Sequence, residues 1–199
     1  MSETLRLPGP RDVRATVSRT DTEAAVVACP PHPQMGGDRR DGRLRAVSDA
    51  LDDRAIACLR FDYGPWDEGQ AEVTDARSAL AWARENFQTV GLFGYSFGGA
   101  VALRAATQES QSDSAPAALS LLAPANSLAG DSVVDAVDAV PCPVQVLYGE
   151  RDDTVDSVPV AQRARERGHT VEALSADHFF VGQQARVAES VATFFADSM

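Results

Sequence analysis

The segment Gly94-Tyr95-Ser96-Phe97-Gly98 places a serine between two glycines with the spacing of a nucleophile in a tight turn. An apolar run at 89–93 precedes it and a run of small residues at 98–107 follows it, which is typical of a strand and a helix. Such a turn would lift the serine hydroxyl clear of a sheet, and its crowded backbone admits only small flanking residues. The Phe97 amide would then point from the helix N-terminus toward an oxyanion. The pattern predicts a nucleophilic serine at position 96.

A serine hydroxyl needs a base, and the chain has three histidines, His32, His169 and His178. His178 follows the last predicted strand, 170–174, and precedes the closing helix. Loops at the carboxyl edge of a parallel sheet face the ligand, so His178 is the predicted base. His169 comes just before the same strand and is expected at the opposite edge, as a surface residue.

An imidazole base needs an acid that fixes its tautomer and stabilises the imidazolium. Asp152 follows the predicted strand 144–148 and lies three residues after Gly149. This spacing directs the carboxylate across the top of the sheet toward the final loop. Glu150 and Asp153 are neighbouring carboxylates, and Asp153 stays open as the alternative. The predicted catalytic set is therefore Ser96, Asp152 and His178.

Apolar runs alternate with amphipathic stretches along nearly the whole chain. Strands are predicted at 5–7, 13–18, 24–29, 54–61, 89–93, 118–122, 144–148 and 170–174. Helices are predicted at 43–53, 73–87, 98–107, 160–167 and 183–196. Residues 109–115 predict a polar loop, and residues 126–140 an irregular loop with one short helix. The alternation predicts an α/β fold of right-handed βαβ units, with a mostly parallel sheet of roughly 7–8 strands and helices on both faces. The length predicts a single domain over 1–199.

Together these motifs resemble those of the α/β-hydrolase superfamily, and the chain is similar to its short, lidless, dienelactone-hydrolase-like branch. The resemblance runs from about Val13 to Phe195 and is carried by residues 29–37, 60–72, 94–99, 149–155 and 176–180. The order serine, aspartate, histidine is the order of that fold. A lid would follow the strand at 118–122, where only residues 125–140 are available, so we expect no cap domain and a shallow, open site.

The resemblance implies a serine hydrolase that cleaves a small carboxylic ester or thioester through an acyl-enzyme at Ser96. Dienelactone hydrolases proper carry cysteine at the nucleophile position of this strand-to-helix turn, which is called the nucleophile elbow. This chain has Ser96 there, and the difference favours carboxyl-ester chemistry over the dienelactone reaction. The alternatives are an acyl thioesterase, a cofactor-free haloperoxidase-like enzyme, and a non-catalytic binding or scaffold protein.

The second oxyanion donor is expected in the loop after the strand at 24–29. The prolines at positions 30, 31 and 33 have no N–H, which leaves the amides of His32, Gln34 and Met35. His32 is favoured and Gln34 stays open. Candidate pocket residues adjoin a motif, although core packing is the alternative role for each: Met35, Trp66, Tyr95 and Phe179.

No phosphate loop, dinucleotide fingerprint or calcium- or zinc-type ligand spacing is present in the sequence, so no cofactor and no metal are expected. The cysteines at positions 29, 58 and 142 form no CxxC pair, which favours a reducing cytoplasm. No apolar run is long enough to cross a bilayer, and the N-terminus lacks the apolar core of a secretory signal.

The charge balance is strongly acidic. The net charge is −11, all 18 basic residues are arginine, and 19 aspartates stand against 10 glutamates. A field of that sign repels nucleic acid and anionic membranes, so neither is expected as a partner. The resemblance implies a small-molecule acyl substrate as the partner. Whether the chain is a monomer or a homodimer stays open. An acidic, lysine-free chain resembles proteins of a salt-filled cytoplasm, and the alternative is a genome rich in G and C.

Overall fold

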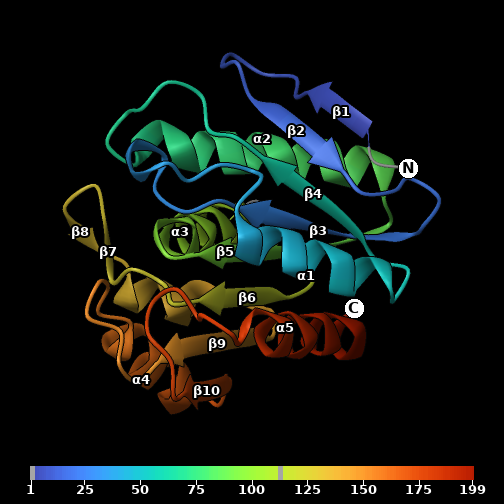
Figure 1. Ribbon diagram of the computed structural model, residues 1–199. Coiled ribbons are helices and arrows are strands. Elements are labelled where there is room, and N and C mark those ends of the chain that lie inside the picture. The colour runs from blue at the N-terminus through green and yellow to red at the C-terminus, as the bar shows by residue number, and fades with distance from the viewer. Residues whose placement is uncertain (1–2, 112–113) are drawn as a thin grey trace.

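An eight-stranded sheet runs through the centre of the computed structural model, which describes residues 3–111 and 114–199 (Figure 1). The strand order is β1-β2-β4-β3-β5-β6-β9-β10. The six strands from β4 to β10 in this order pair in parallel, and β2 runs antiparallel to both β1 and β4. The predicted mostly parallel sheet is confirmed.

The elements begin and end close to the predicted positions. The strands of the sheet are β1 (Glu3–Arg6), β2 (Arg14–Val17), β3 (Ala24–Cys29), β4 (Ala57–Phe61), β5 (Thr89–Tyr95), β6 (Leu119–Leu122), β9 (Val144–Gly149) and β10 (Thr170–Leu174). The α-helices are α1 (Gly42–Asp52), α2 (Gln70–Asn86), α3 (Phe97–Ser110), α4 (Val158–Glu166) and α5 (Gln184–Ser198). A short 3₁₀ turn, η1 (Pro33–Met35), follows β3.

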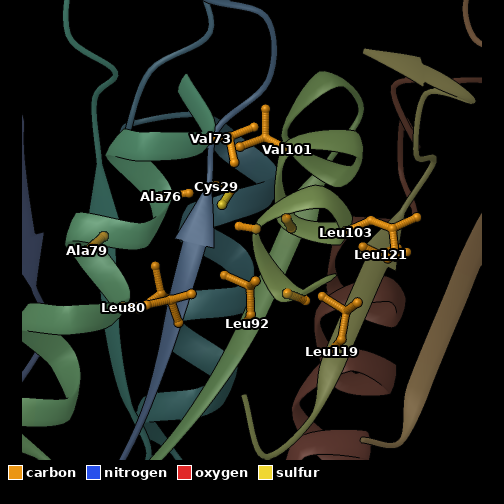
Figure 2. Close-up of a cluster of buried hydrophobic side chains, with 14 of the residues drawn as sticks. Cys29, Val73, Ala76, Ala79, Leu80, Leu92, Val101, Leu103, Leu119 and Leu121 are labelled. Carbon is orange, nitrogen blue, oxygen red and sulfur yellow. The ribbon is translucent and has the colours of Figure 1, made fainter. Parts of the chain in front are cut away.

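Helices cover both faces of the sheet, as the sequence predicted. On one face α1 and α5 lie side by side and bury Leu44 and Val191 against the strands (Figure 1). On the other face α2, α3 and α4 pack on the sheet, and Figure 2 shows Leu80 of α2 directed toward Leu92 of β5. The strands of the centre are apolar on both sides because both of their faces are covered.

Two elements begin three residues away from their predicted starts, for local reasons. The strand expected from Arg54 begins only at Ala57, because residues 54–56 turn back on the end of α1. Ala55 has a left-handed φ of 57°, and the Ile56 N–H donates to the Leu51 carbonyl. Helix α2 begins three residues before the predicted Val73, because the Glu72 carboxylate accepts the Gly69 N–H and caps the first turn.

The connection from β6 to β9 was predicted as an irregular loop with one short helix, and that was incomplete. It holds a two-stranded hairpin, β7 (Ser127–Leu128) and β8 (Asp131–Ser132), and then a 3₁₀ helix, η2 (Val134–Ala139). Ala129 and Gly130 both have positive φ, as a two-residue hairpin turn requires. All of residues 123–143 are described, and they form no cap domain. In the polar loop expected at 109–115, the first two residues extend α3, and residues 112–113 lie outside the described residues.

The order of the central strands creates a crevice at the carboxyl edge. From β3 the chain crosses to β4 on one side, whereas β5 pairs with β3 on the other side. The loops that leave β3 and β5 therefore diverge, and such a switch point is where open α/β sheets bind ligands. Over the described residues, no helix is both long and apolar enough to cross a membrane.

The charge of this fold leads to a prediction about salt. The chain has no lysine, and several arginines are already held by carboxylates: Arg77 and Arg84 both donate to Glu109, and Arg163 pairs with Asp138. With a net charge of −11, the remaining carboxylates repel one another and raise the free energy of the compact state. Salt shortens the Debye length from about 10 Å at 0.1 M to about 3 Å at 1 M, which screens that repulsion.

We therefore expect the melting temperature to rise steeply from about 0.05 M to about 3 M KCl, with structure lost below a few tenths molar. Thermal melting across a KCl series measures this, and a parallel sucrose series controls for general exclusion of solutes from the surface. A melting temperature that stays flat across the KCl series contradicts the prediction. It would indicate that a genome rich in G and C accounts for the lysine-free composition.

Candidate active site

Ser96 lies in a strained turn between β5 and α3. Its φ is 58° and its ψ is −121°, a left-handed conformation that is rare for a residue with a side chain. A Cβ on Gly94 would come 2.1 Å from the Gly98 carbonyl oxygen, and a Cβ on Gly98 would come 2.4 Å from the carbonyl oxygens of Cys29 and Pro30. The two glycines thus allow the backbone segments to meet, and the serine is raised at the N-terminus of α3.

His178 reaches Ser96 from the loop after β10. Its Nε2 lies 3.0 Å from the Ser96 Oγ, and both side chains are buried. The Tyr95 hydroxyl donates to the His178 carbonyl at 3.0 Å, and the two rings stack with centroids 5.3 Å apart. Tyr95 therefore fixes both the backbone and the ring plane of the histidine. His169 precedes β10 and lies at the opposite end of that strand.

Asp152 completes a chain of hydrogen bonds. Its Oδ2 lies 2.7 Å from the His178 Nδ1, and its side chain is only 3% exposed. Its Oδ1 accepts the backbone N–H groups of Thr154 at 2.9 Å and Val155 at 3.0 Å, which fixes the orientation of the carboxylate. The alternative, Asp153, and its neighbour Glu150 are exposed to solvent. Three side chains from three separate loops thus meet at the carboxyl edge of the sheet.

The loop after β3 uses most of its amides internally. The Gln34 N–H donates to the His32 Nδ1 at 3.3 Å, and the N–H groups of Met35 and Gly37 both donate to the His32 carbonyl at 3.0 Å. Within the described ranges, the backbone amides of His32 and Phe97 donate to no acceptor. These two amides are therefore available to a bound group, whereas that of Gln34 is engaged.

A pocket of about 840 Å³ opens beside Ser96 and His178. Two of the pocket candidates, Met35 and Phe179, stand at its rim and are 80% and 50% exposed. The other two, Trp66 and Tyr95, also line it. Further lining residues come from loops, the first turns of α1, α2 and α3, and the β7–β8 hairpin: Pro31, His32, Gly36, Gly37, Asp41, Arg43, Glu68, Gln70, Phe97, Ala125, Ser127, Leu128, Ala129, Gly130, Thr154 and Val155.

Comparison with known proteins assigns a family to this architecture. A model of the dienelactone hydrolase family matches residues 46–194. The chain belongs to the dienelactone hydrolase family. No match to it was found among the curated proteins.

Solved structures support the same fold for this dienelactone hydrolase family member. An α/β serine hydrolase homologue from Coxiella burnetii is 22% identical, has a TM-score of 0.82 and is matched over 96% of each chain. XC6422 from Xanthomonas campestris, a serine hydrolase without a lid, is 25% identical with a TM-score of 0.81, over 96% of this chain and 92% of its own. A dienelactone hydrolase from Anabaena variabilis is 17% identical with a TM-score of 0.76, over 100% of this chain and 96% of its own. The predicted α/β-hydrolase fold is confirmed.

Sequence reasoning missed two walls of the pocket in this member of the dienelactone hydrolase family. The β7–β8 hairpin forms one, and its Leu128 packs on Gly69, where a Cβ would approach within 2.8 Å of the Leu128 Cδ1. Arg43, in the first turn of α1, belongs to the other, with its Nε donating to Asp41 at 3.0 Å and its Cζ lying 4.8 Å from the Tyr95 ring centroid. The sequence could have indicated Arg43, because α1 follows β3, the first parallel strand, and so begins at the same edge of the sheet as the turn that carries Ser96.

The thiol at the end of β3 has no role in this constellation. Cys29 is fully buried, and burial raises the pKa of its thiol well above the usual range, so the sulfur stays protonated. Across residues 3–111 and 114–199, no group of three or more His, Cys, Asp or Glu side chains is arranged to hold a metal ion.

Proposed function

We propose that this chain is a serine hydrolase that cleaves small carboxylic esters through an acyl-enzyme on Ser96. One observation carries the proposal: the hydrogen-bonded chain from the Asp152 carboxylate through the His178 imidazole to the Ser96 hydroxyl, with links of 2.7 Å and 3.0 Å. Each link places a group where general-base activation of a nucleophile needs it. The strained elbow supports the proposal, because backbone strain of this kind persists where function requires it.

In the proposed mechanism, His178 Nε2 takes the Ser96 proton as the Oγ attacks the ester carbonyl carbon. Asp152 holds the Nδ1 proton and stabilises the imidazolium that forms. His178 then gives the proton to the departing alkoxide, the C–O bond breaks, and the acyl group stays on Ser96. Water enters, loses a proton to His178 and attacks the acyl-enzyme. Collapse of the second tetrahedral intermediate returns the proton to Ser96 and releases the acid.

The Phe97 and His32 amides are the proposed oxyanion donors. Phe97 is the first residue of α3, where the N–H groups lack helical partners and the helix dipole favours negative charge. His32 is preferred over Gln34, because the Gln34 amide is engaged with the His32 ring. Each such donor is worth about 10²–10³ in rate.

The charges of the pocket support an uncharged ester as the substrate. Arg43 is the one arginine among the described residues that line the pocket. Its guanidinium forms an ion pair with Asp41 through two hydrogen bonds. Glu68, a further lining residue, is exposed and takes part in no hydrogen bond or ion pair within the described part of the chain. A carboxylate on the substrate would therefore meet no free countercharge.

A fluorophosphonate probe and a substrate panel test the proposal together. We expect covalent labelling of the wild type that disappears in Ser96→Ala, since the probe reacts with activated serines. In the panel, we expect p-nitrophenyl acetate to be hydrolysed faster than matched acyl thioesters and than an ester with a carboxylate on its acyl group. Absence of labelling contradicts the proposal and favours a binding or scaffold role, and a preference for thioesters reassigns the chain as a thioesterase.

A further inference from the structure

The second oxyanion donor lies in a loop whose position depends on a neighbouring segment. The carbonyl of Pro30, two residues before His32, accepts the Tyr63 hydroxyl at 3.1 Å in a buried hydrogen bond. On its other side the same carbonyl lies against Gly98, where an added Cβ would approach within 2.4 Å. The loop is therefore held between Tyr63 and the first turn of α3. Phe97 is in that turn. The backbone of the loop that carries the His32 amide therefore packs directly on the backbone that carries the Phe97 amide.

The His32 ring makes a second contact with the same segment. It lies 4.7 Å from the Trp66 ring and 4.8 Å from the Phe97 ring, measured between centroids. Trp66 and Phe97 are themselves 5.6 Å apart, and the Tyr63 ring meets Phe97 edge-on at 5.7 Å. Residues 63–66 thus touch the oxyanion loop twice, once through a hydroxyl and once through an indole.

Two buried carboxylates of α2 fix the segment that carries Tyr63 and Trp66. Glu72 is fully buried and accepts the N–H groups of Asp67 and Gly69, each at 2.9 Å. Asp75, only 1% exposed, accepts the Gly64 N–H at 2.9 Å and the Arg11 Nε at 2.7 Å. Backbone amides on both sides of Trp66 are therefore tied to a rigid helix. The segment therefore has a fixed position from which it can hold the loop that carries His32.

We propose that Tyr63 is a positioning residue for the oxyanion site: its hydrogen bond to Pro30, together with the Trp66–His32 contact, sets the His32 amide relative to the Phe97 amide. The inference rests on the proposed function. Two donors stabilise one oxyanion only if both come within about 2.7–3.1 Å of it, so a shift of a few tenths of an ångström weakens both contacts. Burial keeps the pKa of the Tyr63 hydroxyl far above its usual value, so the group remains a donor over the working pH range.

Tyr63→Phe tests the proposal, because it removes the hydroxyl and keeps the ring. We expect kcat/KM for p-nitrophenyl acetate to fall by about 10-fold, less than the about 10²–10³ that loss of a whole donor costs. A trifluoromethyl ketone that forms an oxyanion adduct with Ser96 should lose the same factor in affinity. The matching secondary alcohol, which forms no adduct, should bind as it does to the wild type. Active-site titration with the fluorophosphonate corrects for any unfolded fraction, so a loss of stability alone moves neither affinity.

Tyr148→Phe is the matched control. It removes a hydroxyl that accepts from Arg165 at the surface, and we expect no change in either affinity. If Tyr63→Phe binds the ketone as tightly as Tyr148→Phe does, the proposal is overturned while the proposed function stands. If the fluorophosphonate does not label the wild type, both the proposed function and the role of Tyr63 are contradicted. Should Tyr63→Phe not fold, Trp66→Phe is expected to weaken ketone binding by a larger factor than alcohol binding, because Trp66 contacts the His32 ring as well as lining the pocket. Equal factors for the two ligands overturn the proposal.

Discussion

Ser96→Ala and His178→Ala are each expected to lower kcat by about 10⁴–10⁶-fold for the preferred ester. Without the Ser96 Oγ there is no acyl acceptor, and without His178 the hydroxyl, 3.0 Å from Nε2, has no base. Residual turnover would come from the oxyanion donors acting on water. Steady-state kinetics at saturating substrate measure the loss, and Ser78→Ala and His169→Ala serve as controls for the same chemical changes far from the site.

The double variant distinguishes a catalytic unit from two independent residues. Because either single change disables the same proton transfer, the double variant should be little slower than the slower single one. Multiplied losses would contradict the assignment. Stability should stay near that of the wild type, since alanine at position 96 keeps the left-handed φ of 58° and its strain. A large fall in melting temperature would therefore indicate a structural role instead.

Much of this fold could be predicted because its signals are local. The strand β3 has the predicted limits, since the two prolines that follow its apolar run have no N–H with which to continue the ladder. The edge at which Ser96, Asp152 and His178 meet also follows from topology, because all three follow the carboxyl ends of parallel strands. The sequence positions alone therefore place these loops together.

The features of the fold and the site that the sequence did not predict depend on contacts between distant segments. Ala129 adopts a φ of 53° that its residue type does not favour, so the β7–β8 turn has little sequence signal. Glu72 and Asp75 look like ordinary polar positions of an amphipathic helix, yet they are buried because the 64–69 segment folds over them. The choice between His32 and Gln34 required the hydrogen bond from the Gln34 amide to the His32 ring, which no spacing predicts.

Asp152→Asn is expected to lower kcat by about 10⁴-fold through the wrong imidazole tautomer. The N–H groups of Thr154 and Val155 both donate to Oδ1, so the asparagine oxygen must take that place. Its NH₂ group then faces His178 Nδ1, at the position of the present 2.7 Å contact. Because an NH₂ group can only donate, Nδ1 becomes an acceptor and the ring proton moves to Nε2. A protonated Nε2 donates to Ser96 and cannot take its proton.

Kinetics and imidazole ¹⁵N chemical shifts together test this chain of causes. The shifts should show the proton on Nε2 in Asp152→Asn and on Nδ1 in the wild type, with melting temperatures that stay close because the amide is nearly isosteric. Asp153→Asn is the matched control, since that carboxylate is exposed and the same change there should leave kcat within about 2-fold. A mild Asp152→Asn beside a severe Asp153→Asn would move the role of the acid to Asp153. A severe Asp152→Asn with the proton still on Nδ1 would mean that the carboxylate acts through its charge on the imidazolium rather than through the tautomer.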